Sequence, residues 1–498
     1  MRKLYSKYVK CVSLAILISI IEGSASAADV RYSEYYAQRQ EEAFALPLDE
    51  AIGIAVRDNR VIRAAYLQRV AQKFDLYVSE GKFFPKLSLT TGVLDDKSNG
   101  VSSRSKDISS SISLALPTGA NLSVTTKNGL VSSTSSSSTS ITLTQPLLKN
   151  GGIDANTASV RIARIDEQVN RLALKATLSQ TVVQVIYAYR ELLRAQEQKV
   201  IAETSLQRSK DLHSINKSLI STGRMAEVEI FQTEAEVANR EVALEEAENQ
   251  IDTFRLALLA LLALEPRTPL VAIAPKDVRL KGIDPTQALD TALAFQTDYL
   301  ISKLQFDKSR INLDYAKNQG LWDISLVAGM TQTRGAGGGL VSSDATQTSS
   351  STNEASYAGI QLTIPLGDRS IEQATVRASI DLKSQSLRVQ DARQAVEQLI
   401  RDAVRNIQTR WRQLELSKKA GDLSLLKLNA EKEKLQVGRS SNFQILSFEN
   451  DLRNAENARL NAEISYLNAL TNLDERMGKT LDNWGIPIVE AESETYEN

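Results

Sequence analysis

The sequence of 498 residues contains almost none of the side chains that most often form disulfides or bind metals. It has one cysteine, Cys11, and one histidine, His213. Aromatic residues make up 5% of the chain, and the formal net charge of −1 gives no basic surface that would predict a nucleic-acid partner. Beyond the first residues, no apolar stretch approaches the roughly 18 residues that a transmembrane helix needs. These absences argue against disulfide-stabilised, nucleic-acid-binding and helical membrane-spanning proteins.

Enzymes are also disfavoured by the residues that are present. His213 lies within a long predicted helix, where a single histidine is usually a surface or packing residue. Glu245, Glu246 and Glu248 belong to a charged helix face, which indicates solvation. The glycine run at 335–339 does not open a predicted helix and lacks the Lys-Ser/Thr pair of a phosphate loop. We therefore predict a protein that is not an enzyme and that has no cofactor and no metal site.

The first 27 residues have the organisation of a secretory signal peptide. Basic residues precede a short apolar core at 11–21, and Ala25-Ser26-Ala27 is a small-residue cleavage site. Cleavage there starts the mature chain at Ala28 and removes the only cysteine. It also removes four bases and Glu22, which changes the formal charge from −1 to −4. An uncleaved membrane anchor is the alternative. We expect an exported chain without disulfides.

The mature chain contains a tandem duplication. Residues 222–241, TGRMAEVEIFQTEAEVANRE, match residues 437–456, VGRSSNFQILSFENDLRNAE, at Gly, Arg, Ile, Glu, Asn and Glu. The segment KLSLTTGV at 86–93 likewise matches DISLVAGM at 323–330. The predicted organisation is a first repeat at 28–264, a connector at 265–284, a second repeat at 285–478 and a polar C-terminal tail at 479–498.

Each repeat contains two kinds of segment. Apolar residues alternate with Ser, Thr or Gly across about 86–145 and 323–365, which predicts strands with one apolar face. Apolar residues at three- and four-residue spacing across about 153–264 and 371–477 predict two long helical hairpins. Such strands suit a membrane sheet that separates lipid from water, although a soluble sandwich shows the same alternation. The predicted fold class is mainly α with a membrane β part.

The number of predicted strands makes an oligomer necessary if the sheet lies in a membrane. The chain offers four convincing strands, or six if a further pair around Pro117 joins them. A membrane sheet must close on itself, and about eight strands form the smallest closed barrel. Several chains must therefore share one barrel. The hairpins agree, because two rods bury one seam and leave their other faces for neighbours. A lone antiparallel coiled coil is the alternative for this helical part.

Glycine and arginine stand together at the turn of each predicted hairpin, as Gly223-Arg224 and Gly438-Arg439. Glycine tolerates the positive φ with which many helices end. A cation suits the carbonyl end of a helix. From the residues alone, these turns are predicted to be helix caps.

In this order of elements, nearly the whole mature chain resembles the TolC family of outer-membrane channels. The resemblance depends on glycine turns at the hairpin tips, on proline hinges between helix and strand, and on Gln145-Pro146-Leu147 followed by Gly151-Gly152. The tip residues are Thr222, Gly223, Arg224, Val437, Gly438 and Arg439, and the hinges are Pro85, Pro146 and Pro365. The resemblance implies a TolC-like fold in a homotrimer, with one shared barrel in the outer-membrane lipid and a helical tunnel in the periplasm.

The resemblance also implies partners and a site. The tips would dock a periplasmic adaptor (membrane fusion protein) bound to an inner-membrane ABC or RND pump, in drug efflux or type I secretion. Family members often carry paired aspartates just past the second turn, where this chain has Asn442 and Gln444, and it has Glu227 and Glu229 after the first turn. These four residues are the candidates for a pore constriction. The cargo stays open between drug, small molecule and secreted protein, and an exported coiled-coil structural or adhesive protein is the alternative function.

Overall fold

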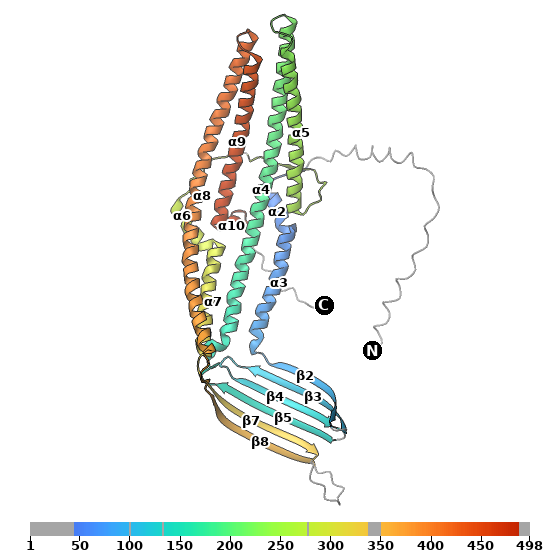
Figure 1. The fold of residues 1–498 in the computed structure, drawn as a ribbon, viewed down its shortest axis with the longest axis vertical. Coiled ribbons are helices and arrows are strands. Elements are labelled where there is room, and N and C mark those ends of the chain that lie inside the picture. The colour runs from blue at the N-terminus through green and yellow to red at the C-terminus, as the bar shows by residue number, and fades with distance from the viewer. Residues whose placement is uncertain (1–43, 99–100, 132–133, 276–277, 337–349, 488–498) are drawn as a thin grey trace, which may run out of the picture.

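The structure is a computed structural model that describes residues 44–98, 101–131, 134–275, 278–336 and 350–487. The signal peptide predicted at 1–27 and the last part of the predicted tail, 488–498, lie outside these residues, as does most of the glycine run at 335–339. The described part is elongated, with long helical hairpins at one end and a single curved sheet at the other (Figure 1).

Two antiparallel hairpins form the helical part. The first consists of α4 (Ile153–Ser221) and α5 (Glu229–Leu262), and the second of α8 (Ser370–Gln436) and α9 (Asn442–Arg476). At about 1.5 Å per residue, α4 and α8 are each roughly 100 Å long. Shorter helices pack beside them: α2 (Leu48–Asp58), α3 (Arg60–Glu80), α6 (Pro285–Phe295), α7 (Thr297–Gln319) and α10 (Thr480–Asn483), with a 3-10 turn η1 (Gly81–Phe83).

The helical segment before the first strand of the sheet consists of two helices, α2 and α3, rather than one. Asn59 separates α2 from α3, and its side-chain oxygen accepts hydrogen bonds from the backbone N–H groups of Val61 (2.8 Å) and Ile62 (3.3 Å). Gln296 caps α7 in the same way through the N–H of Tyr299 at 2.6 Å. The break therefore recurs at the corresponding place in both repeats, because a capping side chain starts a new helix there.

Six strands form one antiparallel sheet in the described residues, the larger of the two counts that the sequence leaves open. They are β2 (Lys86–Ser98), β3 (Val101–Ala115), β4 (Asn121–Val131), β5 (Thr134–Pro146), β7 (Asp323–Ala336) and β8 (Ser350–Thr363), in the order β2-β3-β4-β5-β7-β8. The first repeat supplies four strands and the second supplies two. Pairing of β5 with β7 joins both repeats into one sheet, for example at Ile141 and Met330.

The predicted connector contributes one strand to a small two-stranded sheet. β6 (Leu270–Ala272) lies inside the predicted connector and pairs in parallel with β1 (Phe44–Leu46), near the start of the first repeat. The Tyr189 hydroxyl of α4 donates to the Leu46 carbonyl at 2.8 Å and accepts from the Ile273 N–H at 2.7 Å.

The predicted polar tail begins with a packed segment. Leu481 of α10 is 1% exposed, and Trp484 and Ile486 pack against the same core. Residues 479–487 therefore belong to the folded body, since their apolar side chains have a core to enter once Gly478 turns the chain at φ 69°.

The cores follow the rods rather than forming one globule. One cluster surrounds the middle of α4 and includes residues of α2, α5, β1 and β6. A second joins α6, α8 and α9 at the corresponding level of the second repeat. A third lies near the tips, where Leu212 of α4 meets Leu428, Leu435 and Ile445 of the other hairpin. The two hairpins are thus packed together along their length, and the tips are held by the smallest core.

Candidate functional site: the hairpin tips and the two faces of the sheet

Both hairpin turns are helix caps of the same geometry. Gly223 and Gly438 have φ angles of 71° and 73°. The N–H of Gly223 donates to the Ile220 carbonyl (2.9 Å), and the N–H of Arg224 donates to the Leu219 carbonyl (2.9 Å). The second turn repeats both bonds, from Gly438 to Leu435 and from Arg439 to Lys434. This pair of hydrogen bonds is the Schellman motif, which satisfies carbonyl groups at the end of a helix. The capping role predicted for the two glycines is confirmed.

The six residues of the two turns are exposed at one end of the molecule. Thr222, Gly223 and Arg224 in the first turn and Val437, Gly438 and Arg439 in the second all have exposed surfaces in this chain. The two turns lie at the same extremity, farthest from the sheet (Figure 1). They therefore form a surface that is available to another protein.

The four constriction candidates fall into two groups. The Asn442 side chain is 2% exposed, and its Nδ2 donates to Glu229 Oε2 at 2.9 Å. These two residues come from different hairpins, so the structure brings them together across the tip. Glu227 and Gln444 are exposed.

A partly buried charge network, centred on the buried Glu449, joins α4, α8 and α9 below the tips. Arg208 Nε lies 2.8 Å from Glu449 Oε2, and an Arg208 terminal nitrogen lies 3.2 Å from Glu456. Lys432 Nζ lies 2.9 Å from the other oxygen of Glu449, whose side chain is 3% exposed. Arg240 of α5 adds a 2.7 Å hydrogen bond to Asn450. Sequence reasoning did not find this network, because charges on a helix face are usually solvated and the partners of Arg208 and Arg240 lie more than 200 residues away in the sequence.

A second polar bridge connects the repeats near the middle of α4. Arg190 donates to Asn468 Oδ1 at 3.0 Å and to Thr471 Oγ1 at 2.9 Å, both on α9. Burial lowers the pKa of Arg190 to about 10, so the guanidinium is still protonated at neutral pH. Burial raises the pKa of nearby Asp474 above its usual value, against the charges of Lys281 and Arg190 and a hydrogen bond from Asn483. At this level, polar contacts join α4 and α9 beside the apolar cluster that surrounds the middle of α4.

The two faces of the sheet differ in chemistry. Large apolar side chains stand exposed on one face: Leu87, Leu89, Val93, Ile108, Ile112, Ile141, Leu143, Leu326, Met330, Ile360 and Leu362. The residues between them are mainly Ser, Thr and Gly. On β3, Ser105, Asp107 and Ser109 are less exposed than Lys106 and Ile108. In a curved sheet (Figure 1), the more crowded face is the concave one, so the hydroxyl-rich face is concave and the apolar face is convex.

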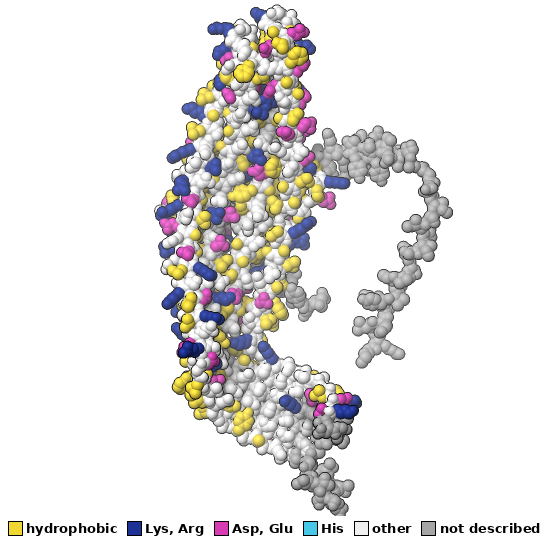
Figure 2. All heavy atoms as spheres, viewed as in Figure 1, with side chains coloured by type: hydrophobic (Ala, Val, Ile, Leu, Met, Phe, Trp, Pro, Cys, Tyr) yellow, Lys and Arg dark blue, Asp and Glu magenta, His cyan; other side chains and the backbone are white. Residues whose placement is uncertain are grey.

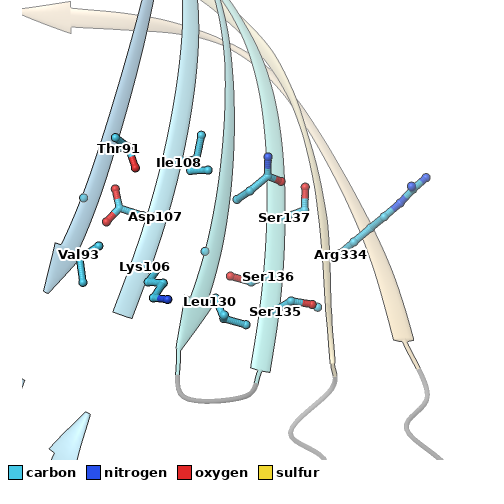
Figure 3. A pocket seen from close by; sticks show the side chains of 14 residues that line it. Thr91, Val93, Lys106, Asp107, Ile108, Leu130, Ser135, Ser136, Ser137 and Arg334 are labelled. Atoms are coloured by element: carbon cyan, nitrogen blue, oxygen red, sulfur yellow. The ribbon is translucent and has the colours of Figure 1, made fainter. Parts of the chain in front are cut away.

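Small residues hollow out the concave face toward the end away from the helices. Gly92, Asp107, Gly129, Ser136 and Gly335 lie opposite one another across successive strands. They line a hollow of about 700 Å³ (Figure 3), in which an oxygen of the Asp107 carboxylate would lie 2.8 Å from a Cβ added to Gly92. Few charged side chains lie on the visible part of the sheet, whereas many lie along the helices (Figure 2). Asp107 is the one charged residue in the row of five residues that lines the hollow.

The proline hinges lie where helix and sheet meet. Pro85 directly precedes β2, and Pro365 follows the end of β8. Pro146 is the last residue of β5 and pairs with Ser325, and pairing continues as the Leu147 N–H donates to the Ile324 carbonyl at 2.7 Å. Exposed apolar residues surround this junction: Phe84, Leu147, Leu148, Leu321, Trp322, Ile364 and Leu366. In the match of KLSLTTGV with DISLVAGM, Trp322 stands at the position of Pro85, so the proline before β2 has no counterpart before β7.

Two features are absent from the described part of the chain. No helix among the described residues is long and apolar enough to cross a membrane. Within the same ranges, no group of three or more His, Cys, Asp or Glu side chains is arranged to hold a metal ion.

Comparison with known proteins gives matches among solved structures only. No family model and no curated protein sequence matches the chain. The CmeC outer membrane channel of Campylobacter jejuni superimposes with a TM-score of 0.64 and 15% identity, covering 87% of this chain and 86% of that one. The outer membrane protein VceC of Vibrio cholerae gives 0.65 and 16%, covering 86% and 96%. The open state of the MtrE outer membrane channel of Neisseria gonorrhoeae gives 0.64 and 16%, covering 87% and 89%. At these identities, the similarity establishes a shared fold.

Proposed function

Because the chain has the fold of the TolC family of outer-membrane channels, we propose that it forms the exit duct of an export system across the outer membrane. Three copies share one β-barrel in the outer-membrane lipid, and their hairpins form a tunnel that extends into the periplasm. The proposal does not include catalysis. The chain carries cargo by enclosing a path for it.

The observation that carries this proposal is the open sheet with its exposed apolar face. Side chains such as Leu87 (73% exposed) and Ile360 (71%) have no protein around them in the chain. A soluble sheet would cover such a face with helices or with a second sheet, and the described helices all lie beyond one end of the sheet (Figure 1). Lipid is the surrounding that suits an apolar convex face and a hydroxyl-rich concave face.

The tips supply the proposed docking surface. Arg224 and Arg439 expose cations at the end that lies farthest from the sheet, which is the end that would meet a periplasmic adaptor and, through it, an inner-membrane ABC or RND pump. Two similar turns per chain give a trimer six contact points. Glu227, Glu229, Asn442 and Gln444 lie immediately beyond these turns, so narrowing of the tunnel at this end would involve them.

Cell fractionation tests the proposal for the assembly. The full chain is expressed with its signal peptide, and membranes are washed with salt and then extracted with detergent. The proposal expects the protein in the detergent extract of the outer membrane, with the mass of three mature chains. Release by salt as a monomer would instead support the exported coiled-coil protein.

Charge reversal tests the docking surface separately. R224E combined with R439E reverses the exposed charge of both tips without altering either glycine. Export should fall in cells that contain the matching adaptor and pump, while trimer yield stays unchanged. K419E is the matched control, since Lys419 is an exposed cation on α8 far from the tip. Normal export by the double variant would show that the tip arginines do not take part in docking the adaptor.

A further inference from the structure

The first repeat contains one β-hairpin more than the second. The duplication matches β2 with β7, through KLSLTTGV and DISLVAGM, and matches β5 with β8, through SITLTQPLL and GIQLTIPLG. In the second repeat, β7 leads directly to β8, which is its antiparallel partner. In the first repeat, β3 and β4 stand between the two matched strands. The hairpin β3–β4, residues 101–131, is therefore an addition to a simpler plan.

The added hairpin is built into the junction between sheet and helices. Its turn has Gly119 at φ 98°, and a Cβ there would lie 2.3 Å from the Asn150 carbonyl oxygen. The Gly152 N–H, at the start of α4, donates to the Thr118 carbonyl at 3.1 Å. Along the strands, both neighbours pair with the hairpin over most of its length. It is part of the wall of the sheet and not a loop lying beside it.

The two edges of the sheet are complementary. In the described residues, β2 and β8 are the end strands, with 13 and 14 residues. β2 runs away from the helices and β8 runs back toward them, so the edges are antiparallel to each other. A copy rotated about the long axis of the molecule can therefore continue the sheet by pairing its β2 with β8. Unpaired backbone groups are not tolerated in lipid, so the membrane sheet requires such pairing.

The side chains indicate the register of this pairing. Convex residues must meet convex residues, because side chains alternate between faces. Pairing Leu87 with Leu362 and Leu89 with Ile360 meets this requirement, aligns the apolar bands and brings Lys86 and Thr363 level at the helical end. Within one chain, the row of paired residues that starts at Leu87 passes through Ile112, Val124, Ile141 and Met330 to Ser356.

This register gives a barrel of ordinary geometry. The row that starts at Leu87 ends at Ser356 on β8, but in the proposed pairing Leu87 of the next chain meets Leu362, six residues farther along β8. Each chain therefore shifts the row by six residues along the strands, and three chains shift it by 18, which is the shear of the closed barrel. The shear then equals the number of strands, as in an eight-stranded barrel of shear eight, whose strands tilt by about 36°. Outer-membrane barrels have tilts of about 35–45°. The edges, the apolar bands and the tilt agree on one arrangement.

We propose that three copies close an 18-stranded barrel through β2 of one chain and β8 of the next, in the register Leu89–Ile360, with β3–β4 as part of the wall. The inference rests on the proposed function. Barrel diameter grows roughly in proportion to strand number, so this barrel is about one and a half times as wide as the 12-stranded one that two hairpins per chain would form. Barrels of 16–18 strands enclose an aqueous channel. The barrel end of the duct is accordingly wide, and the main resistance to the flow of ions lies in the helical tunnel and at its tips.

Cysteine pairs test the register in the assembled protein. L89C/I360C places two cysteines at paired positions on convex surfaces that are 72% and 71% exposed. Paired strand residues have Cα separations of about 4.5–5.5 Å, within the range for a disulfide. Oxidation of membranes should link most chains into covalent trimers on a non-reducing gel. The slipped pair L89C/S356C, about 13 Å out of register along the strand, should not link, and neither single variant should form a trimer.

Electron cryo-microscopy of the same detergent-extracted trimer tests the strand number. Eighteen strands, with β3–β4 between β2 and β5, are expected. A detergent-extracted trimer with 12 strands, or one in which only the slipped pair links, would overturn this inference and leave the channel proposal in place. A monomer released by salt, with no linked chains, would overturn both. The two failures are therefore distinct.

Discussion

The Asn442 side chain donates a hydrogen bond of 2.9 Å to Glu229 Oε2 and thereby joins the tips of two hairpins whose residues lie 213 positions apart. Asn442 is the first residue of α9 and is 2% exposed, and Glu229 is the first residue of α5. Each residue follows a Schellman turn, so the contact is anchored on two capped ends. This contact therefore ties the two tips of one chain together at the end where we propose that the duct narrows.

Replacing the amide by a carboxylate should loosen this contact. N442D places a second acidic group against Glu229, and like charges in a half-buried setting repel. We expect a larger single-channel conductance in planar bilayers. Q444D is the matched control, because Gln444 is exposed and two residues away, so it adds the same charge without facing Glu229. Equal effects of both variants would show that added charge, and not the contact, changes the conductance.

The Arg208 network should contribute strongly to stability. R208Q leaves Glu449 buried at 3% exposure with Lys432 as its remaining charge partner. Removing one partner of a buried ion pair typically costs about 3–5 kcal/mol of stability. Because Lys432 still pairs with Glu449, we expect a loss near the lower end of this range. Thermal unfolding of the detergent-extracted protein measures it. R57Q removes a pair whose arginine is 74% exposed and should leave the unfolding temperature unchanged.

The glycines of the turns should differ from a glycine inside a helix. G223A and G438A put a Cβ on a left-handed residue, which costs about 1–2 kcal/mol. G421A lies within α8, where nothing approaches the added methyl, and should stabilise its helix by about 1 kcal/mol. Amide hydrogen exchange near the tips should quicken in the first two variants only. Unchanged exchange there would contradict the capping role.

Stability should also depend on Asp474. Burial raises the pKa of this carboxyl, so the folded state holds the proton at a pH where the unfolded state has released it. The destabilisation of the folded state by the buried, charged Asp474 carboxylate is absent below the pKa of the unfolded state. It grows as pH rises through the pKa of the folded state. D474N should therefore raise the unfolding temperature at about pH 8 and have little effect at about pH 4. A variant that destabilises equally at both values would contradict this account.

The parts of the fold that follow from periodicity could be predicted from the sequence, and contacts between distant residues could not. Alternation in KLSLTTGV and DISLVAGM locates β2 and β7, and the Gly-Arg pairs locate both turns. The TolC-like fold, which the family resemblance implied, is confirmed by the solved structures. β1 and β6 were missed because three-residue strands have no detectable period. The helix break at Asn59 could have been found, since asparagine is a preferred N-cap.

In the candidate site, too, local features could be predicted from the sequence, whereas contacts between distant residues could not. Capping by Gly223 and Gly438 depends only on local backbone geometry, which the sequence specifies. The pairing of Asn442 with Glu229, and of Arg208 with Glu449, depends on how the two hairpins pack. A single sequence carries no local signal of that packing. Sequence reasoning chose Asn442 and Glu229 for their positions after the turns, but it did not predict that they touch.

Conductance of the purified, detergent-extracted protein in planar bilayers, with its mass measured on the same sample, tests the central claim most directly. The account predicts a species with the mass of three mature chains that inserts and conducts ions in discrete steps, and whose steps grow in N442D. A monomer that stays in solution without detergent and leaves the bilayer insulating would contradict it.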